Sequence, residues 1–289
     1  MALRDTILPS YSTDTYDVYE LDQQLLLVAH DRLYINEQKI SDQIENKGRA
    51  VMHLAVYWYE LFEAIIDTNF VSADVADLPK AFEPYADELH NRFMLTAKVD
   101  EYPIRAQVLG YLTDQVIDEY QSTSTVGGVD TEPGLVLNSK LEQVIFIPYL
   151  LTEGSSTGEQ IDLFKTIELF EARDAMVLCS NALELYEIIH SLALSLGVVF
   201  VDINLRFGSV DNRVVLASVP TADNSLLWQS EVLQADQKPT LYLQEVYDWL
   251  ASDNNQTTQK QLLPAALSDL TSKRLIELSE TITRESLAD

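Results

Sequence analysis

Three polar side chains alternate along an apolar stretch after residue 197. In the sequence GVVFVDINLRFG, residues 197–208, Asp202, Asn204 and Arg206 occupy every second position after the run Val198–Val201. The apolar run predicts a central strand, and a period of two places the three polar side chains on one face of it. A carboxylate, an amide and a guanidinium aligned on a core strand predict that this strand lines a cleft.

The other residue types that support chemistry do not form a recognised site. Residues 154–158, GSSTG, match the nucleophile-elbow pattern, which requires a strand before it and a helix after it; here the composition predicts a surface loop. The phosphate-binding P-loop pattern is absent from the sequence. The four histidines and the single cysteine lack the spacing of zinc ligands, and we interpret His53 and His190 as ordinary helix residues. These residues therefore predict no metal site.

The charge of the chain narrows the range of partners. Nineteen Lys and Arg residues oppose 46 Asp and Glu residues, which gives a formal net charge of −27 over 289 residues. Nucleic-acid binding depends on the neutralisation of phosphates by cations, so the charge argues against it. The same field opposes nucleoside triphosphates unless a local basic pocket overrides it. Solubility, including adaptation to salt, is the simplest explanation of the acidity.

The composition also predicts a folded protein and the cellular compartment in which it resides. Apolar residues make up 47% of the chain, which predicts a folded protein with one large domain or a few smaller ones. A single cysteine suits a reducing compartment. We find no basic segment followed by an apolar one at the start, and no apolar run close to the length of a membrane helix. We therefore expect a cytoplasmic protein with no membrane partner.

Strand-like and helix-like segments are segregated along the chain, which predicts an α+β fold. Apolar spacing predicts helices within 47–66, near 113–120, over 163–196 and in two C-terminal segments joined by the polar stretch 252–261. Strands are expected near residues 16–29, after Lys98, and in a hairpin that turns at Asp211 and Asn212. Residues 127–158 have a loop-like composition.

At the level of families, the chain resembles SAICAR synthetase, the ligase that uses ATP to join aspartate to a carboxylated imidazole ribotide. The resemblance runs almost from end to end and is carried by eight ordered segments. The segments are YDVYELDQQLLLVAHDR, NKGRAVMHLAVYWYELF, GYLTDQVIDEYQSTSTVGGV, EPGL, VIFIP, VDINLRFG, VPTADNSLLW and LQEVYDWL. They are similar to family motifs such as G-K-G-R, G-Y-L-T-G-S, P-I-F-T-P, A-D-T-K-F-E-F-G and L-T-P-D-S-S-R-F-W.

This resemblance implies a fold with a smaller β-rich N-terminal lobe, a larger α+β lobe, a cleft between them and C-terminal helices. It implies boundaries at residues 1–97 for the nucleotide lobe, 98–240 for the substrate and metal lobe, and 241–289 for the C-terminal helices. In the family, the glutamate of K-F-E-F-G and the aspartate of a following V-D-E hold the magnesium that bridges the ATP phosphates. Those two positions are Arg206 and Ala217 in this chain.

Further departures from the family affect the charged positions of the cleft. The ATP strap G-K-V-R-D reads Thr13–Asp17, and leucines replace three family cations, which predicts a cleft reshaped toward apolar content. The altered cleft positions are Asp14, Tyr16, Leu109, Asp114, Gln115, Leu151, Asn204, Ser218 and Leu226. The positions that keep the family residue are Asp17, Asp31, Arg32, Lys47, Gly48, Asp202, Asp223 and Ser225.

Loss of cations and metal ligands removes the groups that stabilise a transferring phosphoryl group. The sequence therefore predicts a family member that has lost ligation: a pseudoenzyme or a repurposed binding protein, with no cofactor expected and no catalytic residue assigned. A divergent active ligase that needs ATP and magnesium is the first alternative, and an acidic interaction protein with a filled cleft is the second. The partner is an unidentified neutral or cationic small molecule or a protein, and homo-oligomerisation stays open.

Three cations carry specific expectations. We expect Arg206 to take the place of the lost metal and to pair with Asp202 or Asp223, since buried carboxylates need compensation. Lys47 opens a predicted helix, which favours a solvated side chain. Arg32 is expected to pair with a neighbouring carboxylate.

Overall fold

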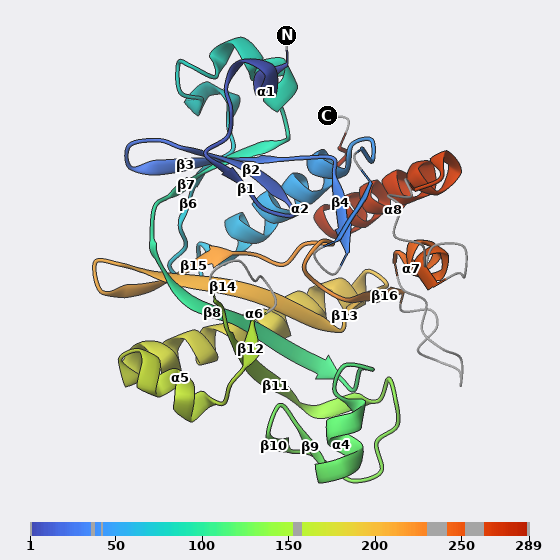
Figure 1. Ribbon diagram of the computed structural model, residues 1–289. Coiled ribbons are helices and arrows are strands. Elements are labelled where there is room, and N and C mark those ends of the chain that lie inside the picture. The colour runs from blue at the N-terminus through green and yellow to red at the C-terminus, as the bar shows by residue number, and fades with distance from the viewer. Residues whose placement is uncertain are drawn as a thin grey trace.

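Two five-stranded antiparallel sheets face each other in the computed structural model, with helices between and beside them (Figure 1). The structure describes residues 2–35, 38–41, 43–152, 158–229, 242–251 and 263–287. The predicted α+β class is confirmed, whereas the boundaries at residues 97 and 240 stay predictions.

The N-terminal sheet has the order β1-β2-β3-β7-β6. Its strands are β1 (Tyr11–Ser12), β2 (Tyr16–Glu20), β3 (Gln24–Ala29), β6 (Phe70–Ser72) and β7 (Phe93–Ala97). On one face, Leu26 and Phe93 pack against Leu3 of α1 (Leu3–Thr6), Phe82 just before η2 (Glu83–Tyr85) and Leu89 of α3 (Ala86–Leu89). The short helix η1 (Val75–Asp77) lies beside the same cluster. The other face, with Leu27 and Met94, contributes to the main core.

The second sheet has the order β12-β11-β8-β14-β15. Its strands are β8 (Asp100–Tyr111), β11 (Lys140–Leu150), β12 (Glu159–Gln160), β14 (Asp202–Val210) and β15 (Arg213–Ser218). Asp211 and Asn212 join β14 to β15 with φ of 50° and 60°, the pair of left-handed residues that a tight hairpin requires. The predicted hairpin turn is confirmed.

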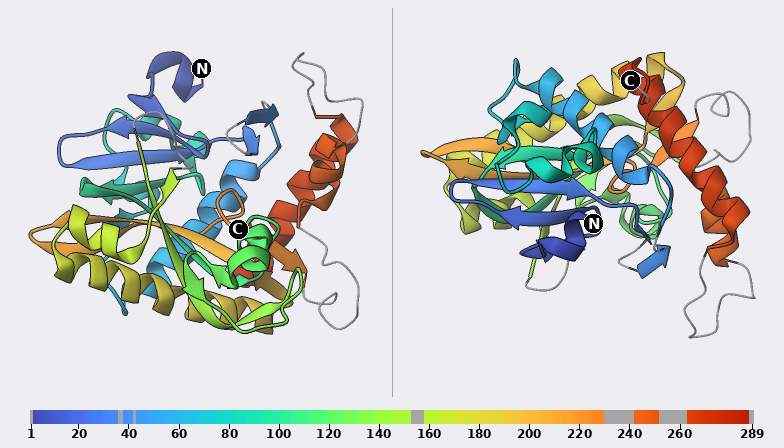
Figure 2. Two further views of the ribbon diagram at one scale, coloured as in Figure 1. Left: turned by 60° about the horizontal axis from the view of Figure 1, so that its bottom comes forward. Right: turned by 90° about the horizontal axis from the view of Figure 1, so that it is seen from above.

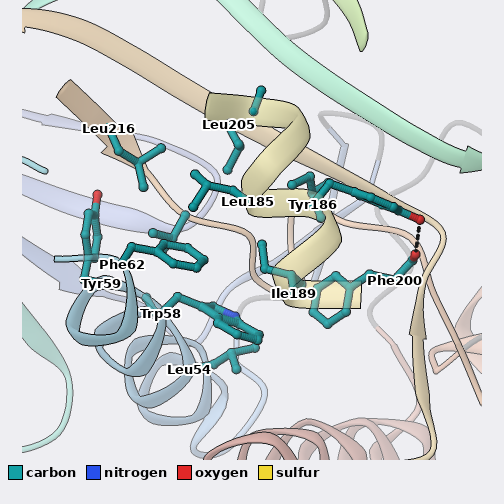
Figure 3. Packing of buried hydrophobic residues seen from close by; sticks show 14 of the residues in the cluster. Leu54, Trp58, Tyr59, Phe62, Leu185, Tyr186, Ile189, Phe200, Leu205 and Leu216 are labelled. Carbon is teal, nitrogen blue, oxygen red and sulfur yellow. Dashed lines mark hydrogen bonds between the residues drawn. The ribbon is translucent and has the colours of Figure 1, made fainter. Parts of the chain in front are cut away.

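Helices α2 (Lys47–Phe62) and α6 (Ala172–Ser195) pack together in the main core, and α6 covers the face of the second sheet that carries Ile203, Leu205 and Phe207. Figure 3 shows Trp58 and Phe62 of α2 near Leu185 and Ile189 of α6. Tyr186 donates a hydrogen bond from its hydroxyl to the Phe200 carbonyl oxygen at 2.9 Å. Among the described helices, only α6 is long and apolar enough to cross a membrane by length and composition. Here α6 instead packs one face into the core.

Smaller elements complete the fold. Three two-stranded sheets pair β4 (Leu33–Ile35) with β5 (Gln38–Ser41), β9 (Thr125–Val126) with β10 (Val129–Asp130), and β13 (Val198–Phe200) with β16 (Leu227–Gln229). The remaining helices are α4 (Ile117–Thr123), α5 (Leu163–Leu169), α7 (Gln244–Ala251) and α8 (Ala265–Thr283). Figure 2 shows α8 along one side of the molecule next to α2, where His53 Nδ1 lies 2.8 Å from Ser279 Oγ.

Two expectations need correction and two lie outside the described residues. Residues 127–158 are not only loop, because β11 occupies 140–150. Pro148 is compatible with this strand because it lies toward the edge of the sheet, where only its carbonyl oxygen is used and accepts a hydrogen bond from the Ile161 amide at 2.9 Å, just beyond the short β12. Helix α2 ends at Phe62, before the predicted 66. Most of GSSTG and the polar stretch 252–261 lie outside the described residues.

Candidate functional site

A cavity of about 430 Å³ lies over the face of β14 that carries the alternating polar residues. Asp202, Asn204 and Arg206 all line it, which confirms the cleft predicted from their spacing. The turn before β2 contributes Asp14, and α7 contributes Tyr247. The cavity is thus enclosed by parts of the N-terminal sheet, the second sheet and the C-terminal helices.

The floor of the cavity is formed by paired residues of β8 and β14. Asn204 lies opposite Gln107, and Arg206 lies opposite Arg105. Sequence reasoning missed Arg105 and Gln107, although they also occupy alternate positions of a strand. That alternation is the signal that could have placed them on the same face.

Asp202 is the deepest carboxylate of the floor and is 6% exposed. Its Oδ2 accepts a hydrogen bond from Gln107 Nε2 at 2.5 Å, and its Oδ1 accepts one from the Leu226 amide at 2.7 Å. Burial raises the pKa of Asp202, while these hydrogen bonds and the charge of Arg105 oppose the shift. Asp202 is therefore a fixed acceptor in the floor of the cavity.

Arg105 is held between an aromatic ring and an amide. Its guanidinium lies 4.0 Å from the centroid of the Tyr149 ring, and its Nη1 donates a hydrogen bond to Asn204 Oδ1. The Asn204 amide in turn donates to the Asn224 carbonyl oxygen at 2.7 Å. Burial lowers the pKa of Arg105, with Tyr149 and Asp202 acting in the opposite direction. This network fixes a guanidinium in the cavity wall.

Lys47 is fully buried, so the expectation of a solvated side chain is wrong. Its Nζ lies 2.5 Å from Asp223 Oδ2, and the Asp223 side chain is only 8% exposed. Burial is possible because the carboxylate compensates the ammonium charge. Next to Lys47, the Gly48 amide donates to Asp31 Oδ1 at 2.9 Å, and a Cβ at Gly48 would lie 2.4 Å from the Ala29 carbonyl oxygen. The start of α2 therefore requires both glycine and the Asp31 carboxylate.

Arg32 pairs with a neighbouring carboxylate, as predicted. Its Nη2 lies 2.6 Å from Asp17 Oδ1, and Arg4 Nε lies 3.4 Å from the other oxygen of Asp17. Burial alone would raise the pKa of Asp17, but the hydrogen bonds from Ser12 and Arg32 and the two positive charges lower it. Neither Asp17 nor Arg32 lines the cavity. Their ion pair holds β2 beside the chain after β3.

Arg206 has a different partner from the one predicted. Its Nη2 lies 2.6 Å from Glu101 Oε2, and the two side chains are 34% and 47% exposed. Asp202 bonds to Gln107 and the Leu226 amide, and Asp223 pairs with Lys47. The expected pair with Asp202 or Asp223 is therefore wrong, because other groups already satisfy both carboxylates.

The residues at the positions that the resemblance implies for the metal ligands do not fit magnesium. Mg²⁺ takes oxygen ligands, whereas these positions hold the Arg206 guanidinium and the methyl group of Ala217. Among the described residues, no group of three or more His, Cys, Asp and Glu side chains could hold a metal ion. We therefore assign no chemical step to a metal-bound nucleotide in this chain.

The strap position is also unlike a phosphate clamp. The turn at 13–15 is closed by hydrogen bonds to Thr13, and His30 Nε2 lies 3.1 Å from the Thr13 carbonyl oxygen. Burial raises the pKa of Tyr16 far above its usual range, and the nearby Asp223 charge adds to the shift. Tyr16 packs against the main core. A neutral phenol therefore occupies the position that the resemblance gives to the strap arginine.

The remaining predicted positions divide between the cavity and its surroundings. Leu226 lines the cavity, but Leu109 is buried with Leu112 and Val116, and Leu151 follows β11 outside the lining. The lining is mixed: polar side chains are more numerous, and Leu33, Tyr34, Leu226, Leu243 and Tyr247 add apolar surface, although two of the three leucines predicted to supply it lie outside the cavity. The predicted positions that line it are Asp14, Gln115, Asp202, Asn204, Arg206, Ser218, Asp223, Ser225 and Leu226. Those that do not are Tyr16, Asp17, Asp31, Arg32, Lys47, Gly48, Leu109, Asp114, Leu151 and Ala217.

Comparisons with known proteins agree with the sequence resemblance. The family model described as SAICAR synthetase matches residues 11–263. The phosphoribosylaminoimidazole-succinocarboxamide synthase of Syntrophotalea carbinolica is 30% identical over 270 residues, which cover 92% of this chain and 91% of the relative. The synthase of Pelobacter propionicus is 28% identical over 94% of this chain and 93% of its own.

Solved structures of the same kind also superpose on the fold. The SAICAR synthase from Saccharomyces cerevisiae complexed with SAICAR has a TM-score of 0.88 at 25% identity, over 99% of this chain and 98% of its own. The SAICAR synthetase of Pyrococcus horikoshii has a TM-score of 0.66 at 17% identity, over 94% of this chain and 98% of its own, a likeness of fold alone.

Proposed function

The chain belongs to the SAICAR synthetase family, and we propose that it is a repurposed member that binds a small molecule without ATP-dependent ligation. One observation carries the proposal: a guanidinium, ion-paired with Glu101, occupies a position where the family places a magnesium ligand. A fixed positive charge there would repel the divalent cation. Phosphoryl transfer depends on such cation-assisted charge stabilisation, so its loss argues against ligation.

The charges around the cavity favour a neutral polar ligand. Two charged residues of the cavity lining are already paired within the protein. Lys47 compensates the charge of Asp223, and Glu101 compensates the charge of Arg206. Gln107, Asn204 and Ser225 use part of their hydrogen-bonding capacity within the protein, and the lone pairs and N–H groups that remain can bind a ligand. A volume of about 430 Å³ is within the range of small-molecule sites. The open cavity supports ligand binding over the interaction protein with a filled cleft.

A ligation assay tests the proposal directly. The purified chain is incubated with carboxyaminoimidazole ribotide, aspartate, ATP and magnesium, and SAICAR and ADP are measured. The synthase of Syntrophotalea carbinolica serves as the positive control. We expect no SAICAR above the reaction without protein. SAICAR formation that requires both ATP and this chain would overturn the proposal and favour the divergent active ligase.

Nucleotide binding gives a second readout. A ligand at about 100 times its Kd stabilises a protein by about 2.7 kcal/mol, so Mg-ATP binding would appear as a higher melting temperature. We expect no shift for the wild-type chain. The double variant Arg206→Glu, Ala217→Asp restores two carboxylates, and we expect it to gain a magnesium-dependent shift with ATP.

The divergent ligase stays the second candidate because part of the family's site persists. Asp202, Lys47 and Asp223 keep the family residues and lie in or beside the cavity. A relative 30% identical to the chain is named as a synthase. We expect the chain in the cytoplasm under either function.

A further inference from the structure

The outer edge of β11 is only partly covered by other strands. β8 lies on the inner side of β11 and β12 on the outer side, and β12 pairs with only the last two residues of β11. The Pro148 carbonyl oxygen also uses the outer side, where it accepts a hydrogen bond from the Ile161 amide at 2.9 Å. Further back, the Glu142 amide donates to Glu132 Oε1 at 2.8 Å, a side chain from the loop after β10. The edge between Glu142 and Pro148 is left uncovered.

The alternation of the strand shows which backbone groups that edge presents. Along a strand, the N–H and C=O groups of successive residues point to opposite sides. Glu142 and Pro148 both bond on the outer side and are separated by an even number of residues, so Val144 and Phe146 also present their N–H and C=O groups there. Within the described part of the chain, no hydrogen bond satisfies these outward groups. Each of the two residues thus leaves one donor and one acceptor open to pairing.

This open edge lies in a cavity of about 410 Å³, which Val144 and Phe146 both line. The β9–β10 hairpin lines it with Val129, and the first turn of α5 lines it with Phe164. Phe164 is 81% exposed and Val129 is 49% exposed, so both walls present apolar surface to solvent. This cavity shares no lining residue with the cavity over β14. An open sheet edge beside apolar walls is the geometry by which proteins bind an extended peptide as an added strand.

The charges of the lining select the kind of partner. Asp130, Glu132, Glu142 and Asp162 line the cavity, and none of the described lining residues is Lys or Arg. A second copy of this chain would bring the same carboxylates to the edge, and its net charge of −27 would add to the repulsion. A basic segment would instead compensate these charges. The lining therefore favours a cationic partner over self-association.

We propose that the outer edge of β11 binds an extended basic segment of a partner protein, which pairs with Val144 and Phe146 as an added strand. Side chains of a strand alternate between its two faces. Cationic side chains of the segment would then lie near Glu142 and Asp130, while apolar side chains at the alternate positions would contact Phe164.

A fluorescently labelled peptide of alternating lysine and valine, seven residues long and blocked at both ends, tests this inference in anisotropy titrations with the full chain. We expect saturable binding that weakens as salt is raised, since exposed charge pairs are screened. The matching peptide of glutamate and valine should not bind.

Methylation of the peptide backbone separates strand pairing from charge attraction. In an added strand, only every second N–H group points toward β11. Two peptides are therefore compared, one methylated at the backbone nitrogens of the odd positions and one at those of the even positions. We expect one of them to lose binding and the other to keep it. This comparison uses the wild-type chain, so it does not depend on the folding of a variant.

Variants of the edge give a second test. Val144→Pro removes one outward N–H group, and strand edges tolerate proline, as Pro148 shows. It should raise the Kd of the lysine peptide by about two- to tenfold, the range for loss of one hydrogen bond. Glu142→Gln should raise it by about two- to fivefold, the range for one exposed charge pair. The matched control is Glu83→Gln, an exposed position of η2 outside the cavity, which should leave the Kd unchanged.

Cys179 provides a readout that is confined to this cavity. It is the only cysteine of the chain, and it lines the cavity. Burial raises the pKa of its thiol, so its reaction with a thiol reagent is followed at mildly alkaline pH. Saturating lysine peptide should slow this reaction, with a midpoint at the Kd measured by anisotropy.

Several outcomes would overturn the inference. One is an absence of saturable peptide binding, and another is an unchanged reaction rate of Cys179 at saturating peptide. Equal effects of the two methylated peptides would show that no strand is added, and equal weakening by Glu83→Gln would show general attraction to an acidic surface. Self-association of the chain that Val144→Pro abolishes would assign the edge to a second copy. None of these measurements involves ATP or SAICAR, so they are independent of the proposed function.

Discussion

Lys47 Nζ lies 2.5 Å from Asp223 Oδ2, and the lysine side chain is fully buried. The two residues are 176 positions apart and join the start of α2 to the loop after β15. Removing one member of a buried pair leaves the other charge uncompensated, which costs about 3–5 kcal/mol. The pair therefore ties α2, which packs beside the N-terminal sheet, to the loop that follows the second sheet.

We predict that Lys47→Met and Asp223→Asn each lower the free energy of unfolding by about 3–5 kcal/mol. The double variant Lys47→Met, Asp223→Asn should recover much of that loss, because it leaves no buried charge alone. Urea denaturation measures all three. Additive losses in the double variant would show that the two side chains do not compensate each other.

Breaking the Arg206–Glu101 pair should have a far smaller effect. Both side chains are partly exposed, at 34% and 47%, and exposed ion pairs contribute about 0–1 kcal/mol. Glu101→Gln is therefore expected to change the free energy of unfolding by less than about 1 kcal/mol. A loss as large as that of Lys47→Met in the same urea experiment would show that this pair is effectively buried.

Gly110 has a steric role next to the core. A Cβ at this position would lie 1.9 Å from the Tyr186 hydroxyl oxygen, which is held by the Phe200 carbonyl. We predict that Gly110→Ala lowers the free energy of unfolding by about 1–3 kcal/mol, the usual range for overpacking. In the Tyr186→Phe background the same change should cost less, because the nearest atom is gone. An equal loss of unfolding free energy in both backgrounds would show that the Tyr186 hydroxyl is not the source of the strain.

The buried carboxyl of Asp202 predicts a specific pH dependence. Its folded-state pKa is raised above 3.8, mainly by burial, so the folded protein binds this proton more tightly than the unfolded chain. Its contribution to stability is full below pH 3.8 and is lost as the pH rises through the folded-state pKa. Compared with the wild type, Asp202→Asn should therefore gain relative stability as the pH rises above 4. Thermal unfolding across that range measures it, and a pH-independent difference would contradict it.

The cleft could be predicted from sequence because the information was local. Alternation of Asp202, Asn204 and Arg206 places their side chains on one face whatever the rest of the chain does. Asp211 and Asn212 likewise predict the turn, since few residues accept its left-handed backbone. The family resemblance supplied the rest of the architecture.

The ion-pair partners could not be predicted because they depend on distant residues. Glu101 is 105 positions from Arg206 and is brought near it only by the register between β8 and β14. The burial of Lys47 likewise depends on Asp223. Strand β11 was missed because turn-forming residues on both sides masked its apolar run from Val144 to Leu150.

The main core has a consequence for how the molecule melts. Residues of the N-terminal sheet, α2, α6, β14 and α8 share one apolar cluster, and Thr68 bridges to Leu216 across the seam. The N-terminal sheet therefore cannot lose its packing while the second sheet keeps its own. A differential scanning calorimeter should record a single endotherm with matching calorimetric and van't Hoff enthalpies, the signature of a cooperative unit.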